Sequence, residues 1–448
     1  MKLHRTLLVA ALICISASFL TAQEPQKQEK SKIISLTVNT AVQMALDTNI
    51  TIQREKIQLN QSKRNYDHSW NKVLPSINAS LSGTPAGELS QSDKNTILTK
   101  AGVTASLTLT TGLGAQIKKL KANYKAGLAS YEDTVRNTEI EVRQAFYQLL
   151  YKKEVYDVAV TNQQSYQQAY DLTKTKRDHG MVPEIDLLTA QVNLESAKLD
   201  TTSAQIDYMT CLIEFLDTIG VEPDPDMEIH IVGTLDVADT VSDIPFNVAL
   251  EAKNTSSEIR ILKEQLEVAK LTKADTALGS YLPSLTLSGS VYPYESTQQL
   301  SSNTTTKSDS WSASIGITIP LDSYIPGSSK SDSIKDAKDT IQDLELQIKD
   351  KSNSITTDVI NKQQSIKLSK ETLESRHLKV ELAKQQLELT QEAYNKGTKD
   401  LETLTSAMDS YRSAQLDLRS QQYNLLNSVL ELESTISCPA NTYIKDTE

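Results

Sequence analysis

The chain has 448 residues, few aromatic or glycine residues and a formal net charge of −11. This length would suit about three ordinary domains, but the abundant Gln, Ser, Thr, Lys, Asp, Leu and Ala favour long solvated helices over thick globular cores. The acidic balance excludes the basic footprint of a nucleic-acid-binding protein, so we expect no nucleic-acid partner.

The N-terminus has the layout of a secretory signal. A basic start at Lys2 and Arg5 precedes an apolar run from Leu7 to Leu20. This order of segments is typical of a signal peptide. We therefore predict a signal peptide over residues 1–22 and a polar leader over residues 23–35.

The first repeat is predicted to cover residues 36–219. It begins with a helix that reaches about Trp70 and is interrupted near Thr48. Two segments then alternate apolar residues with Ser, Thr or Asn, which predicts strands near 75–83 and 102–110. The polar stretch between them is predicted to be a loop.

The second repeat, residues 244–436, follows a linker at 220–243 and precedes a C-terminal tail at 437–448. Its strands are predicted near 283–292 and 311–320, again joined by a polar loop. Two sets of small residues recur at identical spacing in the two halves, namely Gly180, Ala190 and Ala197 in the first and Gly397, Ala407 and Ala414 in the second. This recurrence indicates an internal two-fold repeat.

The longest helix is predicted from Ser329 to Asn395, because that span contains no Pro or Gly. At 1.5 Å per residue it would measure roughly 100 Å. Its apolar residues follow two heptad series that are offset by four residues, namely Ile334, Ile341, Ile348 and Ile355, then Val359, Ile366, Leu373, Val380, Leu387 and Tyr394. So thin an apolar seam predicts a helical bundle or the wall of a tube.

The predicted strands are apolar on one face and rich in hydroxyl groups on the other. This alternation suits a barrel with lipid outside and water inside, or else a two-faced sheet over a soluble core. Four short strands cannot close a barrel, because about eight are needed. Either several chains share one barrel or the sheet is small.

The sequence offers no constellation for catalysis. The five histidines are scattered, and the pair Gly112 and Gly114 lacks the third glycine and the Lys-Ser/Thr step of a phosphate loop. We therefore expect no catalytic residues, no cofactor and no metal, and interpret the chain as a conduit or a scaffold.

The segment Tyr394–Thr398, followed by Leu401, Leu404 and Ala407, resembles the returning-helix motif of the TolC-like outer-membrane efflux proteins. With the signal peptide, the repeat and the paired strands, the resemblance extends from about Leu36 to Ile436. It implies a fold that is mainly α with β, in which a trimeric long α-helical barrel, or tunnel, is topped by a shared 12-stranded transmembrane β-barrel with four strands per chain.

The same resemblance implies an outer-membrane exit duct, with its helical tunnel in the periplasm. The duct would belong to a tripartite efflux or type I secretion system and pass drugs, small molecules or proteins. Its partners would be outer-membrane lipid, a periplasmic adaptor (membrane fusion) protein and an inner-membrane pump of RND or ABC type. The alternative is a periplasmic coiled-coil scaffold or adaptor without a pore.

The resemblance also implies a polar latch that closes the tunnel tip through contacts between neighbouring hairpins. Asp186, Tyr394 and Lys399 occupy the latch positions. Lys399 replaces the arginine often found there, and an ammonium cannot form the bidentate bond of a guanidinium. The alternative is that Asp186 and Lys399 are ordinary solvated charges at helix ends.

Two further sets of tip residues follow from the resemblance. The family's ring of aspartates falls here on Thr403 and Ser406, with Asp400 and Glu402 nearby, so the constriction is acidic at shifted positions or not acidic. The turns at the two hairpin ends are expected to dock the adaptor through four small residues, namely Gly180, Ala190, Gly397 and Ala407. Alternatively, the alanines pack the hairpins within one chain.

Overall fold

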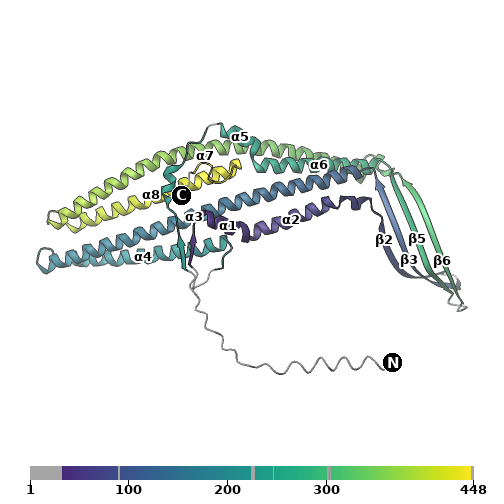
Figure 1. The fold of residues 1–448 in the computed structure, drawn as a ribbon, viewed down its shortest axis with the longest axis horizontal. Coiled ribbons are helices and arrows are strands. Elements are labelled where there is room, and N and C mark those ends of the chain that lie inside the picture. Colours follow the sequence, from purple (N-terminus) through teal and green to yellow (C-terminus); the bar gives the residue numbers. More distant parts are fainter. Residues whose placement is uncertain are drawn as a thin grey trace, which may run out of the picture.

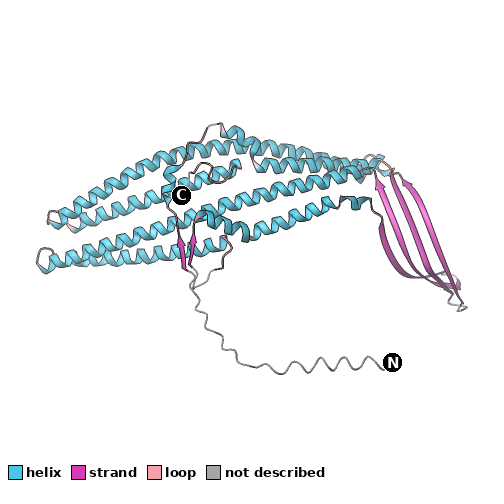
Figure 2. Ribbon diagram, viewed as in Figure 1, coloured by secondary structure: helices cyan, strands magenta, loops and turns pink. Residues whose placement is uncertain are grey.

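The computed structural model describes residues 33–88, 91–222, 228–245, 247–299, 302 and 304–444. The predicted signal peptide and most of the predicted polar leader lie outside the described residues. The described part is elongated, with a helical bundle at one end and a curved sheet at the other (Figures 1 and 2).

The first helical segment is α1 (Val38–Thr48) followed by α2 (Ile50–Asp67), with a short 3-10 helix, η1 (Ser69–Val73), after it. The side-chain oxygen of Asn49 accepts hydrogen bonds from the backbone N–H groups of Thr51 and Ile52. Asn49 therefore caps α2 at its N-terminus, and the predicted interruption is confirmed.

Two long helical hairpins make up most of the bundle. The first joins α3 (Leu113–Asp178) to α4 (Glu184–Thr218), and the second joins α7 (Ser329–Asn395) to α8 (Leu401–Ile436). Both predicted ends of α7 are confirmed. The shorter helices α5 (Val248–Thr255) and α6 (Ser257–Tyr281) lead into the second pair of strands.

The large sheet contains β2 (Ser76–Glu88), β3 (Gln91–Thr110), β5 (Ser284–Gln299) and β6 (Thr304–Thr318), all antiparallel and in the order β2-β3-β5-β6. A 3-10 helix, η3 (Asp322–Tyr324), connects β6 to α7.

The stretches 84–100 and 293–309, predicted to be loops, are largely strand, so that prediction was wrong. Both stretches are polar in composition, but they contain threonine, which has a high strand propensity. Their backbones continue the hydrogen bonding between neighbouring strands. Pro85 is tolerated because β2 is an edge strand of this sheet, and Pro293 lies at a β-bulge.

A second, two-stranded sheet was missed by sequence reasoning. It pairs β1 (Ile33–Leu36) in parallel with β4 (Glu228–Ile231), and a 3-10 helix, η2 (Leu235–Thr240), follows β4. The predicted linker therefore carries ordered structure. Strands of four residues are at the lower limit of the length over which alternation can be recognised, and the residues of β1, Ile-Ile-Ser-Leu, do not alternate.

Two clusters of buried apolar side chains hold the helices together. The larger one lies where α4 and α8 end, and it includes Phe146, Phe215 and Leu425. The smaller one lies between the hairpins near their turns, and it includes Tyr166 and Tyr394. The second cluster gives the two hairpins a shared interior.

The described part of the C-terminal tail is held by a buried carboxylate. Glu433 accepts hydrogen bonds from the backbone N–H groups of Asn441 and Tyr443, each at 2.9 Å. The carbonyl oxygen of Tyr443 then accepts a bond of 2.8 Å from the N–H of Ser242. The tail thus packs against the bundle and against the segment that precedes α5.

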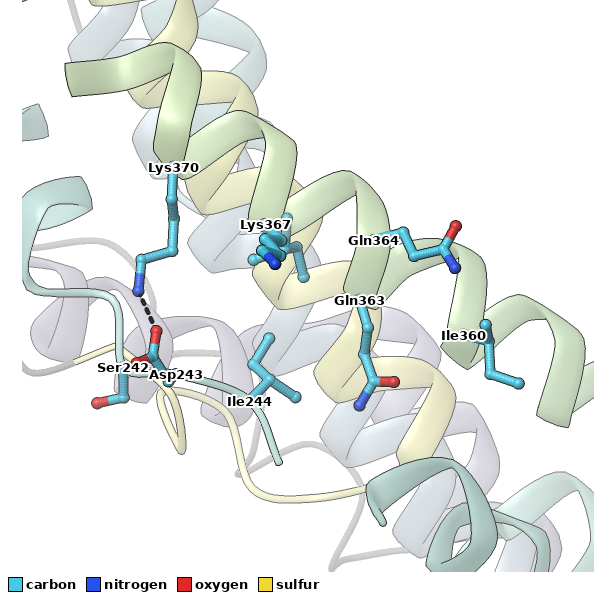
Figure 3. Close-up of a pocket in the computed structure, with 9 residues that line it drawn as sticks. Ser242, Asp243, Ile244, Ile360, Gln363, Gln364, Lys367 and Lys370 are labelled. Carbon is cyan, nitrogen blue, oxygen red and sulfur yellow. Dashed lines mark hydrogen bonds and ion pairs between the residues drawn. The ribbon is translucent and has the colours of Figure 1, made fainter. Parts of the chain in front are cut away.

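The segment that precedes α5 also crosses α7, and a cavity of 380 Å³ lies between the two (Figure 3). Lys370 reaches across its end and pairs with Asp243 at 2.7 Å. The remaining lining is mixed, with Ile244, Ile360 and Ile366 beside glutamines and Lys367. The described residues contain no cluster of metal-ligating side chains here or elsewhere.

Candidate functional site: the hairpin tips and the sheet

Each hairpin turns on a glycine in the left-handed region. Gly180 has φ = 70° and Gly397 has φ = 73°. Paired backbone bonds close both helix ends, since the N–H of Met181 bonds to the carbonyl of Lys176 and that of Thr398 bonds to Ala393. This arrangement favours glycine. A Cβ at either glycine would meet open space, so both turns are free surface in the single chain.

The alanines of the expected docking set have a different environment. Ala190 and Ala407 are each 2% exposed. A side chain this buried cannot contact a partner helix without rearrangement. The alternative interpretation, in which the alanines pack the hairpins, therefore accounts for both, while docking at Gly180 and Gly397 stays a prediction.

Tyr394 is the central residue of the tip. It is 1% exposed, and its hydroxyl lies 2.7 Å from that of Thr173 on α3. The ammonium of Lys176 bonds to the carbonyl oxygen of Tyr394 and lies 3.7 Å from the centroid of its ring. Burial raises the pKa of Tyr394 and lowers the pKa of Lys176. Tyr394 thus joins the two hairpins within one chain.

Sequence reasoning missed both partners of Tyr394. Tyr166, Ala169, Thr173 and Lys176 follow one another at steps of three and four residues and are all buried on α3. This spacing continues an apolar seam of the helix. The signal was present, but a lysine at a seam position is usually assigned to solvent.

The other two expected latch residues are not brought together in one chain. Asp186 is half-buried in the first turn of α4, and its charge contributes to the raised pKa of Tyr394. Lys399 is exposed, and its side chain has no hydrogen bond or ion pair among the residues that the structure describes. A contact between Asp186 and Lys399 would have to form between copies of the chain.

The four residues of the expected constriction fall into two pairs with different local roles. Asp400 caps the N-terminus of α8 by accepting from the N–H of Thr403 at 2.9 Å, and Thr403 also donates its hydroxyl. These bonds lower the pKa of Asp400. Glu402 and Ser406 are exposed and line an open groove with Asp409. These groups could therefore form a ring only if several copies of the chain assemble.

Two more polar contacts cross between the hairpins farther from the turns. The hydroxyl of Tyr166 on α3 donates to Asp409 on α8 at 2.8 Å. Arg412 on α8 pairs with Asp200 on α4 at 2.6 Å. Burial, followed by the bond to Asp409, raises the pKa of Tyr166. With Tyr394, these contacts fix the spacing of the hairpins near the tip.

The sheet has two contrasting faces. The strand register places its large apolar residues on one side, where they are exposed, namely Ile77, Leu81, Val103, Val291, Trp311, Ile315 and Ile317. The opposite side, which we call the hydroxyl face, pairs serines across strands, as in Ser288 with Ser314 at 2.6 Å. An exposed apolar surface of this kind marks a contact with a partner or a membrane.

None of the described helices is both long enough and apolar enough to cross a membrane.

The fold matches solved outer-membrane channels along almost its whole length. A crystal structure of CusC gives a TM-score of 0.73 at 14% identity, covering 91% of this chain and 93% of that chain. The Campylobacter jejuni CmeC outer membrane channel gives 0.72 at 17% identity, covering 94% and 93%. The Neisseria gonorrhoeae MtrE outer membrane channel gives 0.72 at 18% identity, covering 91% of each chain.

No curated protein matches the chain significantly. The family model described as outer membrane efflux protein matches residues 41–219 and 252–436. The matched residues include both helical hairpins and all four strands of the large sheet. The chain therefore belongs to the outer membrane efflux protein family.

Proposed function

We propose that three copies of this chain form the outer-membrane exit duct of a tripartite efflux or type I secretion system. The observation that carries the proposal is a pair of exposed apolar seams on the outer helices of the two hairpins. The family membership supports an outer-membrane channel, and the seams indicate how its copies would join.

The seam on α4 recurs at steps of three, four or seven residues along nearly the whole helix. Its exposed members are Met181 at the turn, then Ile185, Leu188, Val192, Leu199, Ile206, Met209 and Ile213. The seam on α7 is shorter and comprises Leu368, Leu378, Leu382 and Leu389. Heptad-like spacing of large apolar residues on an exposed face is typical of a helix that packs against a partner helix.

The two seams match in height above the tip. Leu188 on α4 lies as many positions after Gly180 as Leu389 on α7 lies before Gly397. Two further pairs match in the same way, namely Leu199 with Leu378 and Met209 with Leu368. Antiparallel packing of α4 on α7 would bury all three pairs, and each fully buried side chain contributes about 1.5–3 kcal/mol.

The seams cannot meet within one chain. In the bundle α4 and α7 lie on opposite flanks, with α3 and α8 between them (Figure 1). Each copy would therefore offer α4 to one neighbour and α7 to the other. Such a head-to-tail contact closes into a ring when the rotation permits.

The sheet favours the same arrangement. In the order β2-β3-β5-β6, the outer edges of β2 and β6 are unpaired. Exposed strand edges of this length invite pairing with another chain. Three copies joined from β2 to β6 would give a closed barrel of twelve strands, with the apolar face toward lipid and the hydroxyl face toward water.

The tip is the proposed periplasmic end, where an adaptor and a pump of RND or ABC type would dock. The exposed glycine turns support this placement. Glycine has no side chain, so a partner helix can pack closely against the backbone of the turn. In the assembled ring, Asp186 and Lys399 of neighbouring copies would add a latch to the contacts of Tyr394. A ring of Asp400, Glu402, Thr403 and Ser406 would line the constriction.

The assembly can be tested by disulfide cross-linking in a background without the native thiols of Cys211 and Cys438. The variant Leu199→Cys with Leu378→Cys should give two- and three-chain species and none larger on oxidation. Leu199→Cys with Leu346→Cys is the matched control, because Leu346 is also exposed on α7 but lies much farther from Gly397 than Leu378 does. Monomers alone in the test variant, or equal linking in the control, would refute the α4–α7 contact.

A further inference from the structure

A β-bulge in β5 redirects two side chains of the sheet. Tyr292 is paired with Ser310 on β6 and Glu295 with Ser308, so three steps along β5 match two steps along β6. Without the extra residue, these two side chains would point to opposite faces. With it, both lie on the hydroxyl face. Bulges are a common device for re-aiming a side chain.

The bulge brings together a compact polar cluster. Glu295 on β5 pairs with the ammonium of Lys100 on β3 at 2.8 Å, and the hydroxyl of Ser310 donates to Glu295 at 3.3 Å. The same ammonium lies 5.6 Å from the ring centroid of Tyr292. The side chain of Lys100 is 33% exposed and that of Glu295 is 19% exposed. The pair is thus held from several directions while remaining accessible.

A glycine makes room for the cluster. A Cβ on Gly102 would overlap the ring of Tyr292 and the carbonyl oxygen of Val291. The ring therefore lies directly on the backbone of β3, two residues from Lys100. This close approach fixes the ring beside the ammonium.

The rest of the hydroxyl face carries no charge among the strand side chains that the structure describes. Between the cluster and the helices, its positions hold serine, threonine, asparagine or glycine, as in Asn78, Thr104, Thr286 and Ser312. Lys307 lies on the opposite face, because it pairs with Ser296, the neighbour of Glu295. Among those described side chains, the only fixed charges toward the hydroxyl face are therefore those of one adjacent pair.

We infer that Lys100 and Glu295 form a charge-compensated ring, one pair per copy, that keeps this level of the duct from selecting ions by sign. This inference rests on the proposed function, in which the hydroxyl face lines the duct. A ring of uncompensated charge in a narrow pore concentrates ions of the opposite sign. Because each ammonium has a carboxylate 2.8 Å away, neither small cations nor small anions are favoured at this level.

The test is the reversal potential of single channels under a KCl gradient in planar bilayers. Lys100→Gln leaves three carboxylates and should raise the K⁺/Cl⁻ permeability ratio several-fold. Glu295→Gln should lower it, and the double variant should return it to the wild-type value. Lys307→Gln, on the opposite face, is the matched control and should leave the ratio unchanged.

Two further readings separate a pore effect from misfolding. Lys100→Arg keeps the charge and should keep the wild-type ratio. The shifts should be large at about 0.1 M salt and small at about 1 M, because the Debye length falls from about 10 Å to about 3 Å. A wild-type protein that inserts but never conducts would contradict the proposed function. Normal wild-type conductance with unshifted ratios in both single variants would overturn this inference alone.

Discussion

Replacing Tyr394 with phenylalanine should weaken the contact between the two hairpins by one hydrogen bond per chain. The hydroxyl of Thr173 already donates to the carbonyl of Ala169 at 2.7 Å, so the hydroxyl of Tyr394 is the donor in the bond of 2.7 Å to Thr173. Phenylalanine keeps the ring that packs against Lys176. The substitution therefore removes the donor and leaves Thr173 with its own donation intact.

The expected cost is modest for each chain. A neutral hydrogen bond contributes about 0.5–1.5 kcal/mol, and no cavity larger than one oxygen atom is created. If the three copies open together by moving their hairpins apart, the costs add to about 3 kcal/mol. A change of this size shifts the opening equilibrium by roughly a hundredfold, since each 1.4 kcal/mol is about tenfold.

The assay is the open fraction of single channels in planar bilayers, supported by the sensitivity of cells to vancomycin. Tyr411→Phe is the matched control, because its hydroxyl accepts from Gln415 within the same helix, α8. We expect Tyr394→Phe alone to raise the open fraction. An open fraction at the wild-type level, or an equal rise in Tyr411→Phe, would refute the assignment of Tyr394 to closure.

Three other perturbations address the tip and the tail. The double variant Asp186→Ala with Lys399→Ala should raise the open fraction and the mean conductance by no more than Tyr394→Phe does, because an exposed pair is worth about 1 kcal/mol or less. A double variant with wild-type conductance would exclude this latch. Replacing Gly180 and Gly397 with leucine should abolish export while membrane insertion persists. Replacing them with asparagine, which tolerates positive φ, should preserve export. Export retained in the leucine variant would show that the docking surface lies elsewhere. Burial raises the pKa of Glu433 above 4.5, so its contribution to stability is full below pH 4.5 and is lost as the pH rises through the raised value. The stability of the wild type relative to Glu433→Gln should therefore be greater at pH 4.5 than at pH 7, as measured by thermal unfolding. The same stability difference at both pH values would contradict this.

The helices were the most predictable part of the fold. The absence of Pro and Gly indicated both ends of α7, and a glycine marked each hairpin turn. The extent of the strands was not predictable from composition. Between 84 and 100 the residues look like a loop, yet backbone pairing continues with Pro85 in an edge strand. Cross-strand pairing is decided by the partner strand, which lies far away in the sequence.

The site was predictable only where it repeats a local pattern. Tyr394 could be named as a candidate because its motif is continuous in the sequence, and the structure buries it near the hairpin turn. Its partners Thr173 and Lys176 lie in the other half of the chain, on α3. Ala190 was expected either to dock the adaptor or to pack the hairpin, and the cluster between the hairpins buries it. Contacts that are expected between copies, such as that of Asp186 with Lys399, cannot be identified from the structure of a single chain.

The central claim is that copies of this chain enclose a single water-filled duct. The most direct measurement is the conductance of the detergent-purified, unmodified protein in planar bilayers, with its mass in the same mild detergent determined in parallel. We predict that material with the mass of three chains inserts in discrete steps of uniform conductance. Folded helical protein, with the mass of three chains or of one, that produces no conductance steps would contradict the duct and favour a periplasmic scaffold.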